Sequence, residues 1–324
     1  MKFLNRSDVS TILQDAPEIV RPSVHATYRS LAAGESASAK TTFLKIPNGA
    51  PSRFITLPAY AAANGGTGAA GTKWVSNFRG NVDLDVRPLN TLLLLSETET
   101  GAPVACLEGS ELNLRRTAAS AFLAAECFGF NPSGEPIGLV GAGALAEAFC
   151  AELIQTYSGV HSVVVTDIVE DRARDLVASL TERGIKASVG STEEILREAN
   201  IIVLGTSADE PWIDIDLLPT DRRLILNISA DDLPVEYFSR VLNATDRVAD
   251  VASMPVSLGR AIAQGLDTSE ILELPSMLEA DPVSSDRPVV FSPFGLSVLD
   301  VALADRIYRI AESQGVGVAW DHRG

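Results

Sequence analysis

The chain has 324 residues, of which 46% are hydrophobic and 21% charged, and its formal net charge is −16 at pH 7. This composition indicates a folded protein with room for about two domains, and it excludes the collagen-like, low-complexity and disordered classes. The acidic balance argues against a nucleic-acid-binding protein, which would carry a basic face.

The three cysteines and three histidines show neither paired nor metal-ligand spacing, so we expect no bound metal. The polar N-terminal residues do not form the apolar core of a signal peptide. No apolar run approaches the roughly 20 residues that span a bilayer. We therefore expect a cytoplasmic protein without a membrane or nucleic-acid partner.

The first third of the chain alternates helical and strand-like patterns. Apolar residues at helical spacing predict a helix over residues 17–33 that ends near Gly34. The Gly-rich stretch 61–71 predicts a surface loop. Runs of β-prone residues between Gly, Pro and Asn clusters predict strands at 41–46, 53–57, 72–76 and 91–96.

An Ala-rich stretch then predicts one long helix from Ser110 to Phe128, ended by Gly129. Beyond Pro136, short apolar runs alternate with helical stretches. Continuous apolar strands between helices indicate a parallel sheet buried on both faces, which is the doubly wound α/β plan. These strands are expected at 137–140, 163–166, 201–205, 224–228 and 247–251.

The segment from Gly141 to Ala146 reads GAGALA and lies between the first of these strands and a helix. In this GxGxxA pattern Gly141 permits the tight turn, Gly143 lets the backbone approach a pyrophosphate, and Ala146 lets helix and strand pack closely. The pattern predicts a Rossmann domain that binds a dinucleotide. The expected cofactor contacts in this turn come from Gly141, Ala142, Gly143, Ala144 and Leu145.

Asp167 ends the next expected strand, 24 residues after Gly143. A carboxylate there meets the adenosine ribose hydroxyls and repels a 2′-phosphate, which favours NAD over NADP, although Arg172 and Arg174 nearby leave NADP open. Thr206 and Ser207 follow another strand, where they can contact the cofactor or cap local structure.

Near the C-terminus, residues 289–293 predict a strand and residues 295–314 a long amphipathic helix that packs on the N-terminal domain. We therefore expect an α/β protein in which a doubly wound, parallel-sheet Rossmann domain, residues 118–293, is inserted in a smaller α+β substrate-binding and dimerisation domain. That smaller domain would comprise residues 1–117 and 294–324. Its few apolar strands should not be left with open edges, so we expect a homodimer.

Three segments in this order and spacing resemble the ornithine cyclodeaminase/μ-crystallin family: residues 71–76 followed by Gly80-Asn81, residues 108–119 and residues 226–232. The likeness covers almost the whole chain. Residues 53–58 and the Ser-Pro-Phe-Gly turn that ends at Gly295 look most like the N-((2S)-2-amino-2-carboxyethyl)-L-glutamate dehydrogenase branch.

The resemblance implies roles for individual residues. Lys73 matches the family's catalytic lysine and Arg116 its substrate-carboxylate arginine, while Asp232 matches its catalytic aspartate, with Asp231 as a rival. A further carboxylate-binding cation has two candidates, Lys40 and Arg53. Ser229, in the third segment, joins the cofactor-binding candidates.

The activity that this branch implies is the NAD-dependent oxidation and hydrolysis of N-(2-amino-2-carboxyethyl)-L-glutamate to L-2,3-diaminopropionate and 2-oxoglutarate. Such an enzyme would supply siderophore or peptide-antibiotic synthesis. Its pathway partner would be a pyridoxal-phosphate (PLP) enzyme that condenses O-phosphoserine with glutamate.

Two alternatives remain. One is an ornithine or lysine cyclodeaminase that recycles its NAD. Glu236 stands where cyclodeaminases carry a lysine, which argues against this reading. The other is a non-catalytic, crystallin-like NAD(P)-binding protein.

Overall fold

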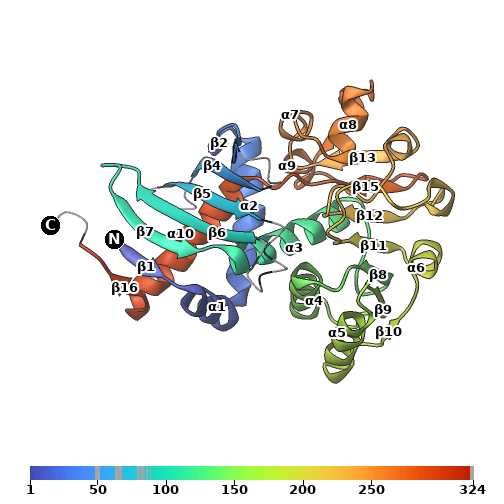
Figure 1. Cartoon of the computed structure of the whole chain (residues 1–324), viewed down its shortest axis with the longest axis horizontal. Helices are drawn as coiled ribbons and strands as arrows, with labels where there is room; N and C mark the ends of the chain where they lie inside the picture. Colours follow the sequence, from blue (N-terminus) through green and yellow to red (C-terminus); the bar gives the residue numbers. More distant parts are fainter. Residues whose placement is uncertain are drawn as a thin grey trace. The chain divides into compact units, whose positions relative to one another are not determined.

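The computed structural model describes residues 1–47, 52–62, 68–78, 81, 84, 87 and 89–321 of the chain. Backbone contacts divide the chain into two compact units. Unit 1 comprises Met1–Thr117 and Gly295–Gly324, and unit 2 comprises Ala118–Phe294. Each unit contains helices and one sheet (Figure 1), so the α/β class expected from the sequence is confirmed.

Unit 1 is built on a mixed sheet with the strand order β16-β1-β7-β6-β5-β4-β2, and β3 pairs with β4 off this path. The strands are β1 (Lys2–Leu4), β2 (Ala37–Ser38), β3 (Thr42–Lys45), β4 (Arg53–Ala61), β5 (Ala69–Asn77), β6 (Leu89–Glu97), β7 (Pro103–Glu108) and β16 (Val318–Ala319). The helices are α1 (Arg6–Asp15), η1 (Pro17–Ile19), α2 (Val20–Ala32), α10 (Ser297–Gln314) and the start of α3 (Ser110–Cys127).

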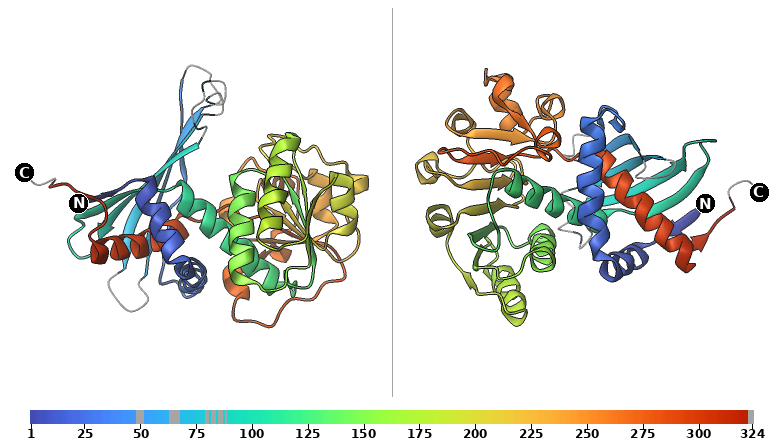
Figure 2. Two further views of the ribbon diagram at one scale, coloured as in Figure 1. Left: turned by 90° about the horizontal axis from the view of Figure 1, so that it is seen from below. Right: turned by 180° about the vertical axis from the view of Figure 1, so that it is seen from behind.

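The unit 1 sheet has one covered and one exposed face. In β6, Leu93 and Leu95 are buried, whereas Leu92 and Leu94 point the other way and are exposed, as the two-residue period of a strand requires. Helix α10 packs on α2 and on β4, β5 and β6, and so covers the buried face (Figure 2). Lys73 in β5 lies opposite Leu93, which places the lysine on that covered face.

Unit 2 is built on a parallel sheet with the strand order β10-β9-β8-β11-β12-β15-β13-β14. Its strands are β8 (Pro136–Val140), β9 (Ser162–Thr166), β10 (Ala187–Val189), β11 (Ile201–Leu204), β12 (Leu224–Asn227), β13 (Leu242–Thr245), β14 (Leu272–Glu273) and β15 (Val289–Phe291). The chain passes from β8 outward to β9 and β10, then crosses to β11 and β12. The crevice at such a reversal of strand order is where open α/β sheets bind ligands.

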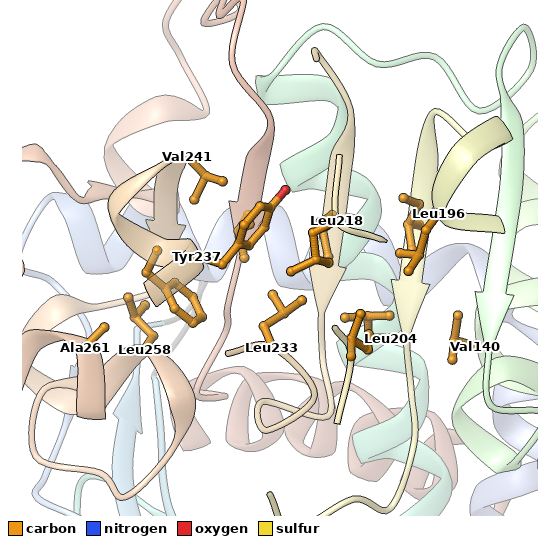
Figure 3. Packing of buried hydrophobic residues seen from close by; sticks show 14 of the residues in the cluster. Val140, Leu196, Leu204, Leu218, Leu233, Tyr237, Val241, Leu258 and Ala261 are labelled. Carbon is orange, nitrogen blue, oxygen red and sulfur yellow. The ribbon is translucent and has the colours of Figure 1, made fainter. Parts of the chain in front are cut away.

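The connections of unit 2 are mainly helical. They are α4 (Ala144–Thr156), α5 (Glu170–Glu182), α6 (Thr192–Glu198), η3 (Ile215–Leu217), η4 (Val235–Ser239), α7 (Val248–Val251), α8 (Ser257–Ala263), η5 (Thr268–Glu270) and α9 (Leu274–Met277). Apolar side chains from the sheet and these connections form a buried cluster that includes Leu204, Leu233 and Tyr237 (Figure 3). Packing on this scale holds the strand ends, and the loops that leave them, in fixed positions.

Two expected elements differ in the structure. Residues 247–251 do not form a strand, because β13 ends earlier, at Thr245, and Val248–Val251 is helix α7. Asp246 accepts a hydrogen bond from the Arg247 amide and so ends the strand, and the apolar residues that follow are three apart, which suits a helix. The loop expected at 61–71 is also shorter, because Ala61 belongs to β4 and residues 69–71 to β5; residues 63–67 and Gly80 lie outside the described part of the chain.

The helices in the described ranges are all too short or too polar to cross a membrane.

Candidate functional site

Lys73 lies in the middle of β5 and is only 5% exposed. Its ammonium Nζ donates to Asp300 Oδ2 at 2.5 Å and to Asn113 Oδ1 at 3.0 Å. The alternation of β5 turns this lysine inward, where an uncharged side chain would be ordinary. A lysine held here by two oxygen acceptors is not a solvated strand lysine.

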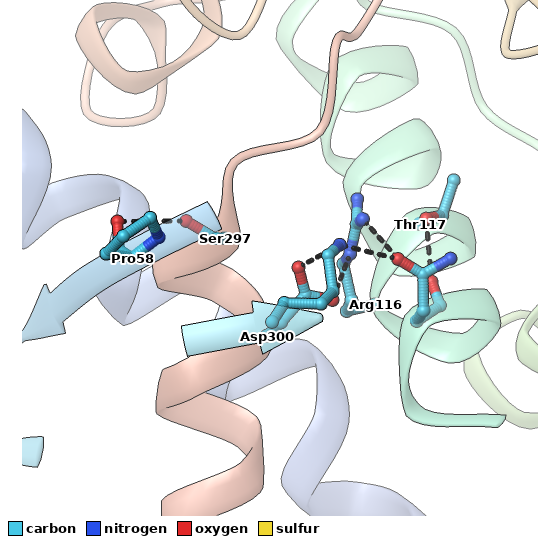
Figure 4. A network of polar contacts seen from close by, with 7 residues as sticks. Pro58, Arg116, Thr117, Ser297 and Asp300 are labelled. Atoms are coloured by element: carbon cyan, nitrogen blue, oxygen red, sulfur yellow. Dashed lines mark hydrogen bonds and ion pairs between the residues drawn. The ribbon is translucent and has the colours of Figure 1, made fainter. Parts of the chain in front are cut away.

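Arg116 joins the same cluster from helix α3. Its Nε donates to Asp300 Oδ1 at 3.0 Å and its Nη2 to Asn113 Oδ1 at 2.6 Å. Asn113 and Arg116 are three residues apart and therefore share one face of the helix. Figure 4 shows Asp300 and Arg116 directed toward each other. The neighbouring Arg115 instead pairs with Glu111 at 3.0 Å, so the two adjacent arginines have different partners.

Asp300 holds both cations and was not expected from the sequence. It lies in the first turn of α10, is fully buried, and gives one carboxylate oxygen to each cation. The N-terminal turn of a helix favours a negative charge. The sequence does contain one signal for Asp300: the residue lies in the apolar stripe of the helix that continues through Leu303, Ala304 and Ile307. An acid buried in such a stripe is usually paired with a cation.

Burial lowers the pKa of Lys73 from 10.5 to about 8; the Asp300 carboxylate opposes this change and the Arg116 charge adds to it. Burial alone would raise the pKa of Asp300, but Arg116 and Lys73 outweigh it and hold that pKa below its usual value. The cluster thus contains a carboxylate whose pKa is held low beside an amine that can gain and lose a proton near neutral pH.

The two remaining cation candidates lie outside this cluster. Arg53 is on the same face of the sheet, but it pairs with Asn77, four residues along β5 from Lys73, or about 13 Å at the rise of a strand. Its guanidinium lies over the Phe43 ring at 5.5 Å. Lys40 is exposed in the connection between β2 and β3.

The Gly-rich turn of unit 2 has the geometry that a dinucleotide requires. Gly141 has φ +99°, and a Cβ there would lie 2.6 Å from the Gly205 carbonyl oxygen, so only glycine fits. A Cβ at Gly143 would meet nothing within 4 Å, which leaves open space at the N-terminus of α4. Backbone amides beside open space at a helix N-terminus form an anion site that suits a pyrophosphate. Ala144 is exposed and Leu145 partly buried at the start of this helix.

Asp167 follows β9 and is hydrogen-bonded to the same turn. Its Oδ2 accepts from the Ala142 amide at 2.7 Å, and its Oδ1 accepts from the Val169 amide at 2.8 Å. The carboxylate therefore orders the glycine turn as well as standing where a ribose is expected. Arg174 is paired with Glu170 and Asp171 on the surface of α5.

Asp232 is fully buried beyond the end of β12 and accepts three side-chain hydrogen bonds. Thr206 Oγ1 and Trp212 Nε1 each donate to its Oδ1 at 2.5 Å, and Ser229 Oγ donates to its Oδ2. Three of the predicted residues, Thr206, Ser229 and Asp232, are thus brought together. Trp212 was not expected from the sequence, because its position in a loop gives no periodic signal.

Asp231, Ser207 and Ala230 do not share the hydrogen bonds of Asp232 that are described above. Asp231 pairs with Arg260 at 2.5 Å, which gives it a structural partner of its own. Ser207 is exposed. Ala230 has φ +73° and is the one non-glycine residue with positive φ in the described part of the chain. Such strain persists only where the surrounding structure enforces it, and it is concentrated at functional sites.

The profile of the ornithine cyclodeaminase/mu-crystallin family matches residues 3–315. The chain belongs to this family. The resemblance read from the sequence motifs is therefore confirmed.

Two curated relatives and one solved structure illustrate the similarity. Alanine dehydrogenase of Archaeoglobus fulgidus is 26% identical over 91% of this chain and 90% of its own length. N-((2S)-2-amino-2-carboxyethyl)-L-glutamate dehydrogenase of Staphylococcus aureus is 23% identical over 82% of this chain and 81% of its own. An archaeal alanine dehydrogenase dimer with bound NAD superposes with a TM-score of 0.88 at 22% identity, covering 99% of each chain. That superposition shows a shared fold.

Proposed function

We propose that this protein is an NAD-dependent enzyme that oxidises a carbon–nitrogen bond of an amino acid. The observation that carries the proposal is the buried pair Lys73 and Arg116, which share the Asp300 carboxylate. One member of the pair can exchange a proton near neutral pH, and the other is a permanent cation. The two curated relatives described above, both amino-acid dehydrogenases by name, support the same class of reaction.

The residues of unit 2 fit NAD. Gly141, Ala142, Gly143, Ala144 and Leu145 would hold the pyrophosphate at the N-terminus of α4, and Asp167 would accept from the ribose hydroxyls. Thr206, Ser207 and Ser229 would line the crevice at the strand ends. Bound NAD supplies the hydride acceptor of the reaction.

Lys73 would act as the general base and acid. An amine releases hydride from its Cα only when its nitrogen is uncharged, so a neutral lysine that removes a proton from the substrate nitrogen promotes oxidation. The resulting ammonium can return the proton during hydrolysis of the imine. Arg116 would bind a substrate carboxylate with its guanidinium, and Lys40 or Arg53 would bind another.

Asp232 would orient or deprotonate the water that attacks the imine. Its three hydrogen-bond donors hold the carboxylate in one orientation, as a positioned acid–base group requires. Thr206 and Ser229 would in this way serve the reaction as well as the cofactor site.

The specific substrate that we propose is N-(2-amino-2-carboxyethyl)-L-glutamate. The secondary amine and NAD would give an imine, NADH and a proton; water would then cleave the imine to L-2,3-diaminopropionate and 2-oxoglutarate. The 23% identical relative named for this substrate supports the choice. The product would feed siderophore or antibiotic synthesis, with a PLP-dependent condensing enzyme as the pathway partner.

The direct test is a substrate panel. Purified protein with NAD is offered the proposed substrate, L-alanine, L-ornithine and L-lysine, while NADH absorbance, ammonia and product mass are recorded. NADH formation with the proposed substrate is the expected result. Ammonia without net NADH would indicate a cyclodeaminase, and no turnover with any compound would indicate a non-catalytic NAD-binding protein.

The site assignment is tested with three variants. Lys73→Ala and Asp232→Asn should each lower kcat by about 100-fold or more, the usual contribution of a positioned acid or base. Lys186→Ala removes an exposed lysine of unit 2 and should retain wild-type rates. Wild-type rates in both site variants would contradict the assignment.

We also propose that the protein is a cytoplasmic homodimer. The exposed face of the unit 1 sheet carries large apolar side chains, among them Trp74, Leu92 and Leu94, which are 43%, 48% and 40% exposed. An apolar sheet face of this kind is typical of an interface between subunits. The dimeric solved relative supports this choice of partner.

A further inference from the structure

We propose that Asp300 is the positioning residue of the unit 1 cluster: it fixes Lys73 relative to Arg116 and keeps the ammonium and guanidinium together in a buried place. This inference rests on the proposed function for the roles of Lys73 and Arg116. In this proposal Asp300 determines the positions of Lys73 and Arg116 and acts through them, without itself contacting the substrate.

The hydrogen bonds form a closed ring. Asp300 uses Oδ2 for Lys73 Nζ and Oδ1 for Arg116 Nε, and Asn113 Oδ1 accepts from both cations on the other side, at 3.0 and 2.6 Å. The four groups come from three elements: Lys73 from β5, Asn113 and Arg116 from α3, and Asp300 from α10. A ring of this kind leaves neither cation free to change its separation from the other.

Backbone packing restrains the guanidinium further. Gly295 has φ +88°, and a Cβ at this position would lie 3.1 Å from both Nη atoms of Arg116. The chain entering α10 therefore passes directly against Arg116. The segment that supplies Asp300 also limits where the guanidinium can move.

The cluster contains two basic groups and one acid, so it carries one net positive charge when Lys73 is protonated. The amide oxygen of Asn113 accepts hydrogen bonds from both cations, as a carboxylate oxygen would, but it is uncharged. The net positive charge of the cluster therefore remains. A buried site with one uncompensated positive charge attracts one substrate carboxylate. Replacing Asp300 by a neutral residue would double the net charge and favour loss of the Lys73 proton.

The sign of this effect can be derived from the groups that face Lys73. The charged neighbours are Asp300 from α10 and Arg116 from α3, while its cross-strand neighbours on β4 and β6, Leu57 and Leu93, are apolar. Asp300 raises the pKa of Lys73 and Arg116 lowers it. Asp300→Asn should therefore move the pKa of Lys73 below about 8, and Asn113→Asp should move it upward.

The chain allows a direct measurement because it contains only five lysines. The protein, labelled with ¹³C-lysine, is titrated while the Cε signals are followed by NMR. Lys73→Met assigns the Lys73 signal. Asp305→Asn, the same substitution at a surface position of α10, is the matched control.

The expected result is opposite movement in the two variants. Relative to wild type, the Lys73 midpoint should fall by about one unit or more in Asp300→Asn and rise by a similar amount in Asn113→Asp, the size expected for an adjacent charge. Asp305→Asn should leave it unchanged. The acidic limb of the pH profile of kcat/KM should likewise move to lower pH in Asp300→Asn and to higher pH in Asn113→Asp.

Different failures have different signatures. Opening of the cluster in Asp300→Asn would expose Lys73 and move its midpoint upward toward 10.5, which would overturn the inference, as would an unchanged midpoint in both variants. If Asp300→Asn does not fold, Asn113→Asp decides the question alone. The titration requires no substrate, so a protein with no turnover would refute the proposed function while leaving this result measurable.

Discussion

The carboxylate of Asp300 accepts a hydrogen bond from Lys73 Nζ at 2.5 Å, although the two residues are 227 positions apart in the sequence. The bond joins a strand that precedes unit 2 to a helix that follows it. The chemistry of unit 1 therefore depends on the C-terminal segment having folded onto the N-terminal sheet.

Asp300→Ala should destabilise the protein strongly at pH 7. It leaves the buried Lys73 and Arg116 without their counter-ion, and removal of one partner from a buried ion pair typically costs about 3–5 kcal/mol. Urea unfolding at equal protein concentration measures the effect. Asp305→Asn, which breaks an exposed pair with Arg309, should cost no more than about 1 kcal/mol. A value for Asp300→Ala as small as that of the control would show that the buried pair does not stabilise unit 1.

The oxidation rate should depend on the protonation of Lys73. Because burial lowers its pKa to about 8, the neutral base is scarce at pH 6 and dominant at pH 9. Below the midpoint, kcat/KM for oxidation should therefore rise about tenfold per pH unit, and it should level off above it. The reverse, reductive reaction needs the protonated lysine and should show the opposite slope. The amine of the substrate also titrates. The midpoint of the kcat/KM profile is therefore assigned to Lys73 only if Asn113→Asp moves it when the substrate is the same. Identical pH profiles for the wild type and Asn113→Asp would show that the titrating group is not Lys73.

Gly141 and Gly143 should respond differently to alanine. Gly141→Ala places a methyl group against the Gly205 carbonyl in a positive-φ conformation, so it should cost about 1–3 kcal/mol of stability as well as NAD affinity. Gly143→Ala meets open space and has an ordinary φ of −85°, so its stability should stay within about 1 kcal/mol of wild type. Its methyl group would occupy the space proposed for the pyrophosphate, and NADH affinity should fall at least about tenfold. Thermal unfolding and NADH fluorescence titration separate the two effects. Unaltered NADH affinity in Gly143→Ala would remove the pyrophosphate from this turn.

Local patterns predicted much of the fold. The long helix that begins at Ser110, the turn at Gly141 and the alternating strands and helices around it all depend on residues close in sequence, and the structure contains them. The strand expected at 247–251 was wrong because a few apolar residues suit either period, and the buried Asp246 that ends β13 is only recognisable once its backbone partners are known.

The candidate site was predicted only in part for a related reason. Lys73, Arg116 and Asp232 came from family motifs, but their partners Asp300 and Trp212 depend on contacts that single-sequence periodicity does not encode. The position of Asp300 in the apolar stripe of α10 indicates a buried acid, but it does not identify the cations that the acid pairs with, and Trp212 lies in a loop without periodicity. The role of Asp300 follows from its burial and its hydrogen bonds, and that of Trp212, which is 47% exposed, from its hydrogen bond to Asp232. Both are properties of the tertiary structure.

Trp212→Phe should weaken catalysis more than folding. It removes one of three donors to Asp232 while keeping an aromatic ring, and a hydrogen bond to a charged group contributes about 1.5–3 kcal/mol. We expect kcat to fall roughly 10-fold or more, with a smaller change in KM, in a steady-state assay with saturating NAD. Trp320→Phe, a half-exposed tryptophan of unit 1, serves as the control. Equal kcat values in the two variants would show that Trp212 does not position Asp232.

Trp74→Glu should dissociate the proposed dimer. Trp74 stacks on Phe54 at a ring separation of 5.3 Å on the exposed sheet face, and a carboxylate placed there would have to be desolvated in any interface. Light scattering after size exclusion should report a dimer for the wild type and a monomer for the variant. Leu217→Glu introduces the same charge at a 43% exposed apolar residue of unit 2 and should remain dimeric. Because the exposed tryptophan contributes little to the core, Trp74→Glu should still bind NADH, which distinguishes loss of the dimer from loss of the fold. A wild-type protein that is monomeric at micromolar concentration would refute the dimer, and a dimeric Trp74→Glu variant would place the interface on another face.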